Sequence, residues 1–122
     1  METYLLFAII AGVIFVATII TGIVLRKREH PYPPLLSTIH KLISLTALVF
    51  VVLSLSELIP GKDMRITGIA LIGLTAVFTL LSLISGGLLV RKTESDSKTV
   101  KLHRVSSIFT FVFIILSIIW FV

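Results

Sequence analysis

The chain contains no cysteine, which excludes disulfides, iron–sulfur clusters, thiolate-ligated zinc and thiol chemistry. Charged residues are also scarce, at 14% of 122 residues, whereas hydrophobic residues make up 57% and the mean hydropathy is +1.14. A soluble domain of this length has too few polar side chains here to cover its exterior. The composition therefore predicts an integral membrane protein whose exterior is lipid. The sequence also lacks any hydrolytic or phosphate-binding motif, and no catalytic triad can be assembled from it.

The net charge of +5 does not indicate nucleic acid as a partner. The basic residues lie in short clusters between apolar runs and not along one face of a soluble helix. The first apolar run is not typical of a cleavable signal peptide. It lacks a basic start and ends in Arg26-Lys27-Arg28 with no small-residue cleavage site. We therefore expect it to remain in the membrane.

Four apolar runs divide the chain, at about 3–25, 36–59, 65–90 and 100–122. Each reaches the roughly 20 residues that a helix needs to cross about 30 Å of hydrocarbon. None shows the period-two alternation of a barrel strand. The connections, Glu29–Pro34, Pro60–Asp63 and Thr93–Ser97, are short and polar, so neighbouring helices should be antiparallel. The sequence predicts an all-α, integral membrane, up-down-up-down four-helix bundle that forms one transmembrane domain over residues 1–122.

The distribution of Lys and Arg predicts the orientation. The first and third connections with their flanks carry nine basic residues, and the second connection carries two. Cytoplasmic loops are enriched in Lys and Arg. We expect a multi-pass protein of the cytoplasmic membrane with both basic loops inside and both termini outside. The nine residues are Arg26, Lys27, Arg28, Lys41, Arg91, Lys92, Lys98, Lys101 and Arg104, and the two are Lys62 and Arg65.

The two halves of the sequence resemble each other. Gly22–Lys27 closes the first run as Gly87–Lys92 closes the third, and both segments end in Arg-Lys. His40–Phe50 and His103–Phe113 open the second and fourth runs, with four of eleven positions identical. The pattern indicates a duplicated helical hairpin whose copies share one orientation and are related by a pseudo-twofold axis along the membrane normal.

Two histidines, His40 and His103, lie about one turn inside the cytoplasmic ends of the second and fourth runs. Ionisable residues within membrane helices are costly and rare. In an up-down bundle these two helices are parallel and diagonal, so the histidines can face each other at one depth. Each belongs to a stripe of small or hydroxyl residues, which should turn toward the protein interior. The stripes contain Ser37, Ser44, Ala47 and Ser54 beside His40, and Ser107, Thr110 and Ser117 beside His103.

Glycines occupy the same depth on the other two helices, at Gly22 and at Gly86-Gly87. Gly22 ends a stripe that contains Thr18, and one of the latter pair continues a stripe through Ser82. Glycine costs about 1 kcal/mol relative to alanine inside a helix and is often placed where a group must approach the backbone. Two imidazoles on one diagonal and glycines on the other predict a slot for a planar macrocycle with an axial nitrogen on each side.

The neighbours of the histidines suit a haem in that slot. Cations near the polar boundary could pair with the haem propionates, and these are Lys41, Lys101 and Arg104. Ser37, with Thr38 and Tyr32, could add hydrogen bonds.

On His40-Lys41, His103-Arg104, Gly22 and Gly86-Gly87, the chain resembles the membrane b-type cytochromes that hold haem between histidines of a four-helix bundle. The resemblance implies a low-spin, six-coordinate haem b, with His40 and His103 as iron ligands, and one-electron transfer. The di-haem families carry four such histidines, two near each face. Here the outer half has none, so one haem per chain is implied. Quinone or a redox partner protein would exchange the electron, and the sequence leaves a homo-oligomer open.

Other interpretations stay open for each of these residues. Histidines near helix ends can simply reach the headgroups, glycines pack membrane helices generally, and the cations follow from the positive-inside bias. His30 should be solvated in its Pro-rich connection, Glu57 should be a boundary residue, and Tyr4 and Trp120 suit an aromatic belt.

Two other functions remain. A small four-helix transporter or channel has this length, but the first run contains no charge and no segment shows a broken helix. A non-catalytic membrane subunit or scaffold is the other. A two-histidine zinc or copper site is disfavoured because two nitrogens underfill a tetrahedral site.

Overall fold

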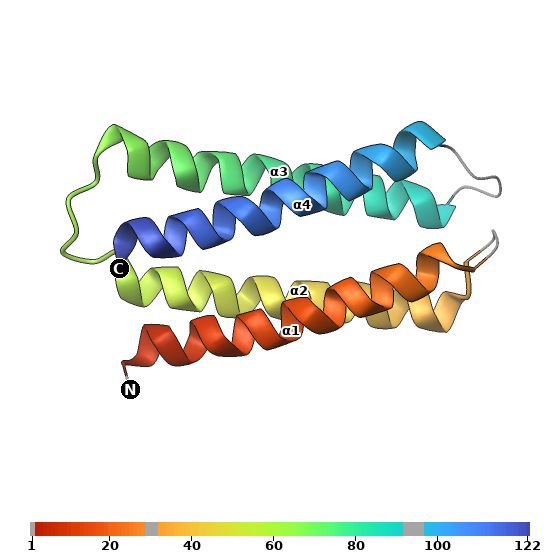
Figure 1. Ribbon diagram of the computed structural model, residues 1–122, viewed down its shortest axis with the longest axis horizontal. Coiled ribbons are helices and arrows are strands. Elements are labelled where there is room, and N and C mark those ends of the chain that lie inside the picture. Colours follow the sequence, from red (N-terminus) through yellow and green to blue (C-terminus); the bar gives the residue numbers. More distant parts are fainter. Residues whose placement is uncertain (1, 29–31, 92–96) are drawn as a thin grey trace. The chain divides into compact units, whose positions relative to one another are not determined.

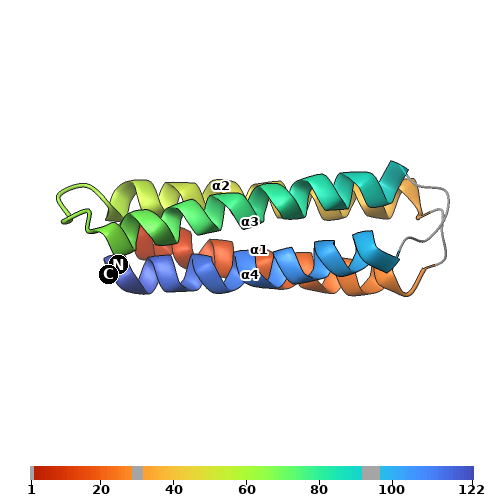
Figure 2. The same ribbon diagram turned by 90° about the horizontal axis from the view of Figure 1, so that it is seen from above.

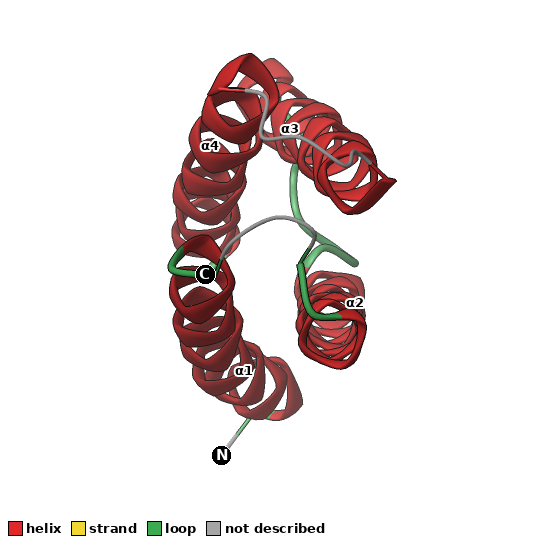
Figure 3. Ribbon diagram, turned by 90° about the vertical axis from the view of Figure 1, so that its right-hand side faces the viewer, coloured by secondary structure: helices red, strands yellow, loops and turns green. Residues whose placement is uncertain are grey.

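The computed structural model describes residues 2–28, 32–91 and 97–122. These residues form four long helices and no strand: α1 (Thr3–Arg26), α2 (Pro34–Leu58), α3 (Ile66–Arg91) and α4 (Ser97–Phe121) (Figure 1). Coloured by secondary structure, the described chain contains only helix and connecting loop (Figure 3). All four helices are long and apolar enough to cross a membrane. The predicted all-α, four-helix class of a multi-pass membrane protein is therefore confirmed.

Two of the helices, α2 and α4, start earlier than the apolar runs that predicted them, whereas α1 starts at the expected residue and α3 one residue later. α2 begins at Pro34, two residues before the expected position, because proline has no N–H to leave unsatisfied in the first turn and its fixed φ suits a helix. α4 begins at Ser97, three residues early, and its first turn is partly polar. Hydropathy marks where lipid begins, whereas a helix can start in the polar boundary. The predicted turn between α2 and α3 is present, with Gly61 at φ +78°.

The chain divides into two compact units, Met1–Pro60 and Gly61–Val122. In each unit two consecutive helices pack on each other, α1 on α2 and α3 on α4 (Figure 1). Figure 2 shows the same four helices from above. The first pair is antiparallel. Ser54 near the end of α2 bonds the carbonyl of Tyr4 at the start of α1, and His40 near the start of α2 meets Thr21 near the end of α1. Each unit is thus a helical hairpin. The prediction of a single domain over residues 1–122 stays a prediction.

The interiors of the two hairpins are built from equivalent positions. Four buried residues of α2 have buried counterparts in α4 that lie 63 positions later: 47 and 110, 51 and 114, 54 and 117, 58 and 121. Ala47, Ser54 and Ser117 have no exposed surface. Small and hydroxyl residues let membrane helices approach closely. The outward faces carry large apolar side chains, as lipid-facing surfaces do. This shared pattern supports the predicted duplication.

Candidate functional site

In the first hairpin, His40 packs its ring against a glycine of the neighbouring helix. It is the seventh residue of α2 and is half-buried. A Cβ at Gly22 would lie 3.2 Å from the Cε1 atom of the ring. The Nδ1 atom is 2.8 Å from Oγ1 of Thr21, the residue that precedes this glycine. One turn further along α2, the Ser44 hydroxyl donates to the His40 carbonyl at 2.6 Å. The imidazole is therefore held between α1 and α2.

His103 has the same setting in the second hairpin. It is the seventh residue of α4 and is also half-buried. A Cβ at Gly86 would lie 2.9 Å from Cε1 of the ring. Nδ1 lies 2.9 Å from the carbonyl oxygen of Ser82 and 3.2 Å from Oγ of Ser85, the residue before the glycine. The Ser107 hydroxyl donates to the His103 carbonyl at 2.6 Å. Each hairpin thus contains a histidine, a glycine and a preceding hydroxyl in one arrangement.

The contacts of His103 determine which ring nitrogen carries the proton. A carbonyl oxygen can only accept a hydrogen bond, so Nδ1 must donate to the oxygen of Ser82. The Ser85 hydroxyl uses its own proton toward the carbonyl of Leu81 at 2.7 Å, and its oxygen is then an acceptor for the same Nδ1–H. In the neutral imidazole the lone pair is therefore on Nε2.

At His40 the contact with Thr21 identifies the two atoms but not the donor. The Thr21 hydroxyl has one proton and three acceptors within reach, namely the carbonyl oxygens of Ala17 and Thr18 at 3.0 Å and Nδ1 of His40 at 2.8 Å. In both hairpins Nδ1 of the histidine therefore lies within hydrogen-bond distance of an oxygen on the neighbouring helix.

The glycine equivalent to Gly22 is Gly86. The comparison of the two run ends matched Gly22 with Gly87, which is one residue off. Among the residues that the structure describes, no atom outside its own stretch of helix comes within 4 Å of the place where a Cβ of Gly87 would lie. Of the two candidates, Gly86 is the one that continues the stripe through Ser82 and meets a histidine. The Arg-Lys pairs align the ends of the first and third apolar runs in the sequence and pair Gly22 with Gly87. The contacts with the histidines show which glycines face the neighbouring helix, and these are Gly22 and Gly86.

The group that comes close to Gly22 and Gly86 is the imidazole of the same hairpin. The sequence predicted a close approach at these glycines and assigned it to the edge of a macrocycle. The close approach is present, and its first partner is the histidine. A role of Gly22, Gly86 or Gly87 in cofactor binding stays a prediction.

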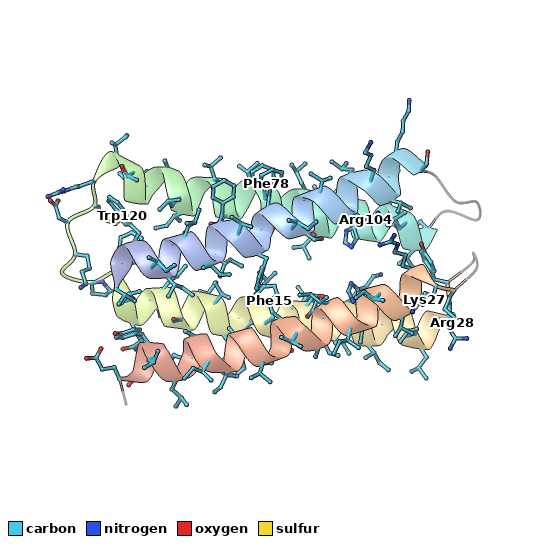
Figure 4. All side chains as sticks on the ribbon, in the orientation of Figure 1. Phe15, Lys27, Arg28, Phe78, Arg104 and Trp120 are labelled. Atoms are coloured by element: carbon cyan, nitrogen blue, oxygen red, sulfur yellow. The ribbon has the colours of Figure 1, made fainter. Side chains whose placement is uncertain are left out.

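The predicted propionate partners lie on the surface beside the histidines. Lys41, Lys101 and Arg104 are all exposed, and Arg104 lies in the half of α4 nearer the α3–α4 connection (Figure 4). Lys27 and Arg28 lie at the α1–α2 connection in the same figure. Exposed cations at helix ends are free to turn toward an anion. Their pairing with propionates stays a prediction.

Ser37 behaves differently from the other predicted polar contacts. Its side chain is only 3% exposed, and its hydroxyl has no hydrogen-bond partner within the described ranges 2–28, 32–91 and 97–122. Thr38 is exposed and donates to the carbonyl of Pro34 at 2.8 Å. Ser37 therefore lies inside the first hairpin, and its bond to a cofactor stays a prediction.

Thr21 and Ser85 are the contacts that the sequence analysis missed. Thr18 and Ser82 were placed on the glycine stripe, whereas the hydroxyls that meet the rings belong to the residues directly before each glycine. The signal was present as a repeated pair, Thr21-Gly22 and Ser85-Gly86, each on the helix before a histidine helix.

The remaining expected residues do not join this arrangement. His30 and Lys92, with most of the third connection, lie outside the described residues. Glu57 and Trp120 are exposed near the opposite helix ends. In the part of the chain that the structure describes, no three or more His, Asp or Glu side chains form a metal-binding group. A pair of histidines has too few side chains to count as such a group.

No protein-family model matches the chain, and neither a curated protein nor a solved structure is significantly similar to it.

Proposed function

We propose that the chain is a membrane b-type cytochrome that binds one haem through His40 and His103 and transfers single electrons. The observation that carries the proposal is the common setting of the two rings. Nδ1 of each lies within 2.9 Å of an oxygen of its own hairpin, and a neutral ring that donates Nδ1–H to that oxygen has Nε2 as its basic nitrogen. Histidines that ligate metals usually donate their other ring N–H to an oxygen acceptor, which fixes the ring and raises its basicity.

The position of the histidines along their helices also suits a shared haem. Both are the seventh residue of a 25-residue helix, which is about 9 Å from the helix start at 1.5 Å per residue. Successive spanning helices alternate in direction, so α2 and α4 begin on the same side of the membrane. Two imidazoles at one depth match the two axial positions of a haem iron. The donor set of the chain therefore fits the group.

A bound haem would supply reversible one-electron chemistry at its iron. If His40 and His103 both held the group, they would leave oxygen no site at the iron, and electron transfer would be the expected activity. The exposed Lys41, Lys101 and Arg104 are available to neutralise the propionates at the polar boundary. Quinol, a soluble carrier or a larger membrane complex would exchange the electron, and a homo-oligomer is compatible with this role.

The proposal includes an orientation. Nine basic residues in and around the first and third connections against two in the second favour a cytoplasmic membrane, with those two connections inside and both termini outside. The haem would then lie nearer the cytoplasmic face, and its electron partners should be accessible from that side.

The absorption spectrum of the purified protein tests the proposal. Protein from haem-replete cells should be red, with a Soret band that shifts and sharpens on reduction. His40→Ala and His103→Ala should each abolish this band while leaving the helix content unchanged. His30→Ala is the matched control and should keep it. A colourless wild-type preparation would overturn the proposed function.

A further inference from the structure

We infer that Thr21 is a positioning residue that holds His40 as the Nδ1–H tautomer, that Ser85 adds to the Ser82 carbonyl in the same role at His103, and that Nε2 is thereby left as the basic nitrogen that a metal would bind. The tautomer part concerns the protein alone. The part about the metal rests on the proposed function. These hydroxyls had no assigned role in the sequence, and the geometry of both hairpins gives them the same one.

The glycines make the contact with the hydroxyls available. A side chain at residue 22 or 86 would have its Cβ only 3.2 Å or 2.9 Å from Cε1 of the imidazole, closer than such atoms ordinarily approach. Without that Cβ the ring lies on the helix backbone. There Nδ1 is within 2.8 Å of Oγ1 of Thr21 in one hairpin and 3.2 Å of Oγ of Ser85 in the other. The pairs Thr21-Gly22 and Ser85-Gly86 therefore contact the ring together: the glycine leaves space for it and the hydroxyl lies within hydrogen-bond distance of Nδ1.

The hydroxyls act as acceptors because the helix takes their protons. Oγ1 of Thr21 has carbonyl oxygens at 3.0 Å three and four residues earlier. Oγ of Ser85 has them at 3.1 Å three residues earlier and at 2.7 Å four residues earlier. A hydroxyl whose proton is committed in this way presents only lone pairs to its second neighbour. It accepts from Nδ1–H, and an Nε2–H tautomer of His40 would keep this bond only if the Thr21 hydroxyl turned its proton from both carbonyls to Nδ1. The helix thereby selects the tautomer.

In the second hairpin Nδ1 of the histidine has a second acceptor besides the hydroxyl. Substitutions of Thr21 and Ser85 should therefore have effects of different size. The Ser82 carbonyl lies 2.9 Å from Nδ1 of His103, and no side-chain substitution removes it. Ser85→Ala should therefore leave His103 as an Nδ1–H donor. Thr21→Val removes the hydroxyl acceptor of His40 while keeping the shape of the side chain, so the effect on His40 should be the larger one.

For a metal ligand, the loss of this acceptor lowers the basicity of the ring. Removing such partners typically costs 10- to 100-fold in metal affinity. A less basic imidazole loses more affinity for ferric iron than for ferrous iron. A tenfold fall in the ratio of ferric to ferrous affinity corresponds to a rise of about 59 mV in a one-electron midpoint potential. Thr21→Val should shift the potential upward on that scale.

The first experiment uses haem-free protein with ¹⁵N-labelled histidine in detergent micelles. Protonated and unprotonated ring nitrogens give well-separated ¹⁵N signals, so each tautomer is observed directly. His40→Gln and His103→Gln assign the resonances. The wild type should show Nδ1–H for both helix histidines. Thr21→Val should convert His40 to a mixture of tautomers, and Thr21→Ser should restore the wild-type state. Thr46→Val, which removes an exposed hydroxyl bonded only within its own helix, is the matched control.

The second experiment measures the midpoint potential of the haem-loaded protein for the same variants. Thr21→Val should raise the potential, Thr21→Ser should return it toward the wild-type value, and Ser85→Ala should change it less. If the wild type binds haem and Thr21→Val changes neither the tautomer of His40 in the haem-free protein nor the midpoint potential of the haem-loaded protein, the positioning role is overturned. The proposed cytochrome function would be unaffected by that result. Nδ1–H histidines in a protein that takes up no haem would overturn the proposed function and support the tautomer assignment. Nε2–H histidines in the haem-free wild type would overturn the inference directly.

Discussion

The imidazole of His103 lies so close to Gly86 that a Cβ at residue 86 would be 2.9 Å from Cε1 of the ring. Gly86→Ala should therefore push the ring off the helix and lengthen its bond to the Ser82 carbonyl. On the proposed function, haem affinity should fall on the order of tenfold or more, as it does when the outer partners of metal ligands are removed. Haem titration of the purified variant measures this directly.

The neighbouring glycine provides the control for that substitution. A Cβ at Gly87 would meet no atom within 4 Å beyond its own stretch of helix. Gly87→Ala should keep full haem affinity and should gain up to about 1 kcal/mol of stability from helix propensity. Equal losses of haem affinity in both variants would show that the fit between His103 and Gly86 does not determine binding.

A second close fit lies at the opposite end of the same hairpin. A Cβ at Gly68 of α3 would be 2.9 Å from Cζ of Phe121 and 3.1 Å from Nε1 of Trp120. Gly68→Ala should force these two rings to move and should destabilise the protein by about 1–3 kcal/mol, the range seen for overpacked interiors. Unfolding in mixed micelles with increasing SDS measures the change. Gly73→Ala is the control, because a Cβ at that position meets nothing within 4 Å, and a loss of the same size in this variant would contradict the steric explanation.

The helices could be predicted from the sequence, because runs of 20 or more apolar residues have few alternatives in a membrane. The starts of α1 and α3 were predicted to within one residue, but those of α2 and α4 could not be placed as well. Pro34 and Ser97 begin α2 and α4, and both lie in polar stretches that were assigned to connections. The start of a helix depends on the fit of the backbone in its first turn, whereas the apolar run reports only contact with lipid.

The site was predicted in its residue types and less well in its contacts. His40, His103 and Gly22 follow from rarity, depth and spacing. The choice of Gly86 over Gly87, and of Thr21 over Thr18 as the hydroxyl at the ring, depends on how each helix is rotated about its axis. One residue changes the direction of a side chain by about 100°, and an almost uniformly apolar sequence carries little information about that angle. The contacts of the imidazoles supply it.

A buried hydrogen bond joins the helices of the first hairpin and should contribute measurably to its stability. Ser54 has no exposed surface, and its hydroxyl donates to the carbonyl of Tyr4 at 2.9 Å. Interhelical bonds of this kind in membrane proteins average about 0.6 kcal/mol and reach about 1.7 kcal/mol. Ser54→Ala should lower the free energy of unfolding by that amount relative to Ser56→Ala, whose exposed hydroxyl bonds within its own helix. The two substitutions share the same gain in helix propensity, so equal stabilities would show that the bond contributes nothing.

The absence of native cysteine allows the proposed orientation to be tested with single introduced thiols. Met64 is exposed in the connection between α2 and α3, and Ser97 is exposed at the start of α4. One spanning helix, α3, separates the two positions in the chain, so they should lie on opposite sides of the membrane. On intact cells a membrane-impermeant maleimide should label Met64→Cys and should reach Ser97→Cys only after lysis. The reverse pattern would invert the orientation, because the bias in Lys and Arg places the α3–α4 connection inside. Labelling of both positions from outside would contradict the crossing of α3 and with it the depth argument that gives His40 and His103 a shared level in the bilayer.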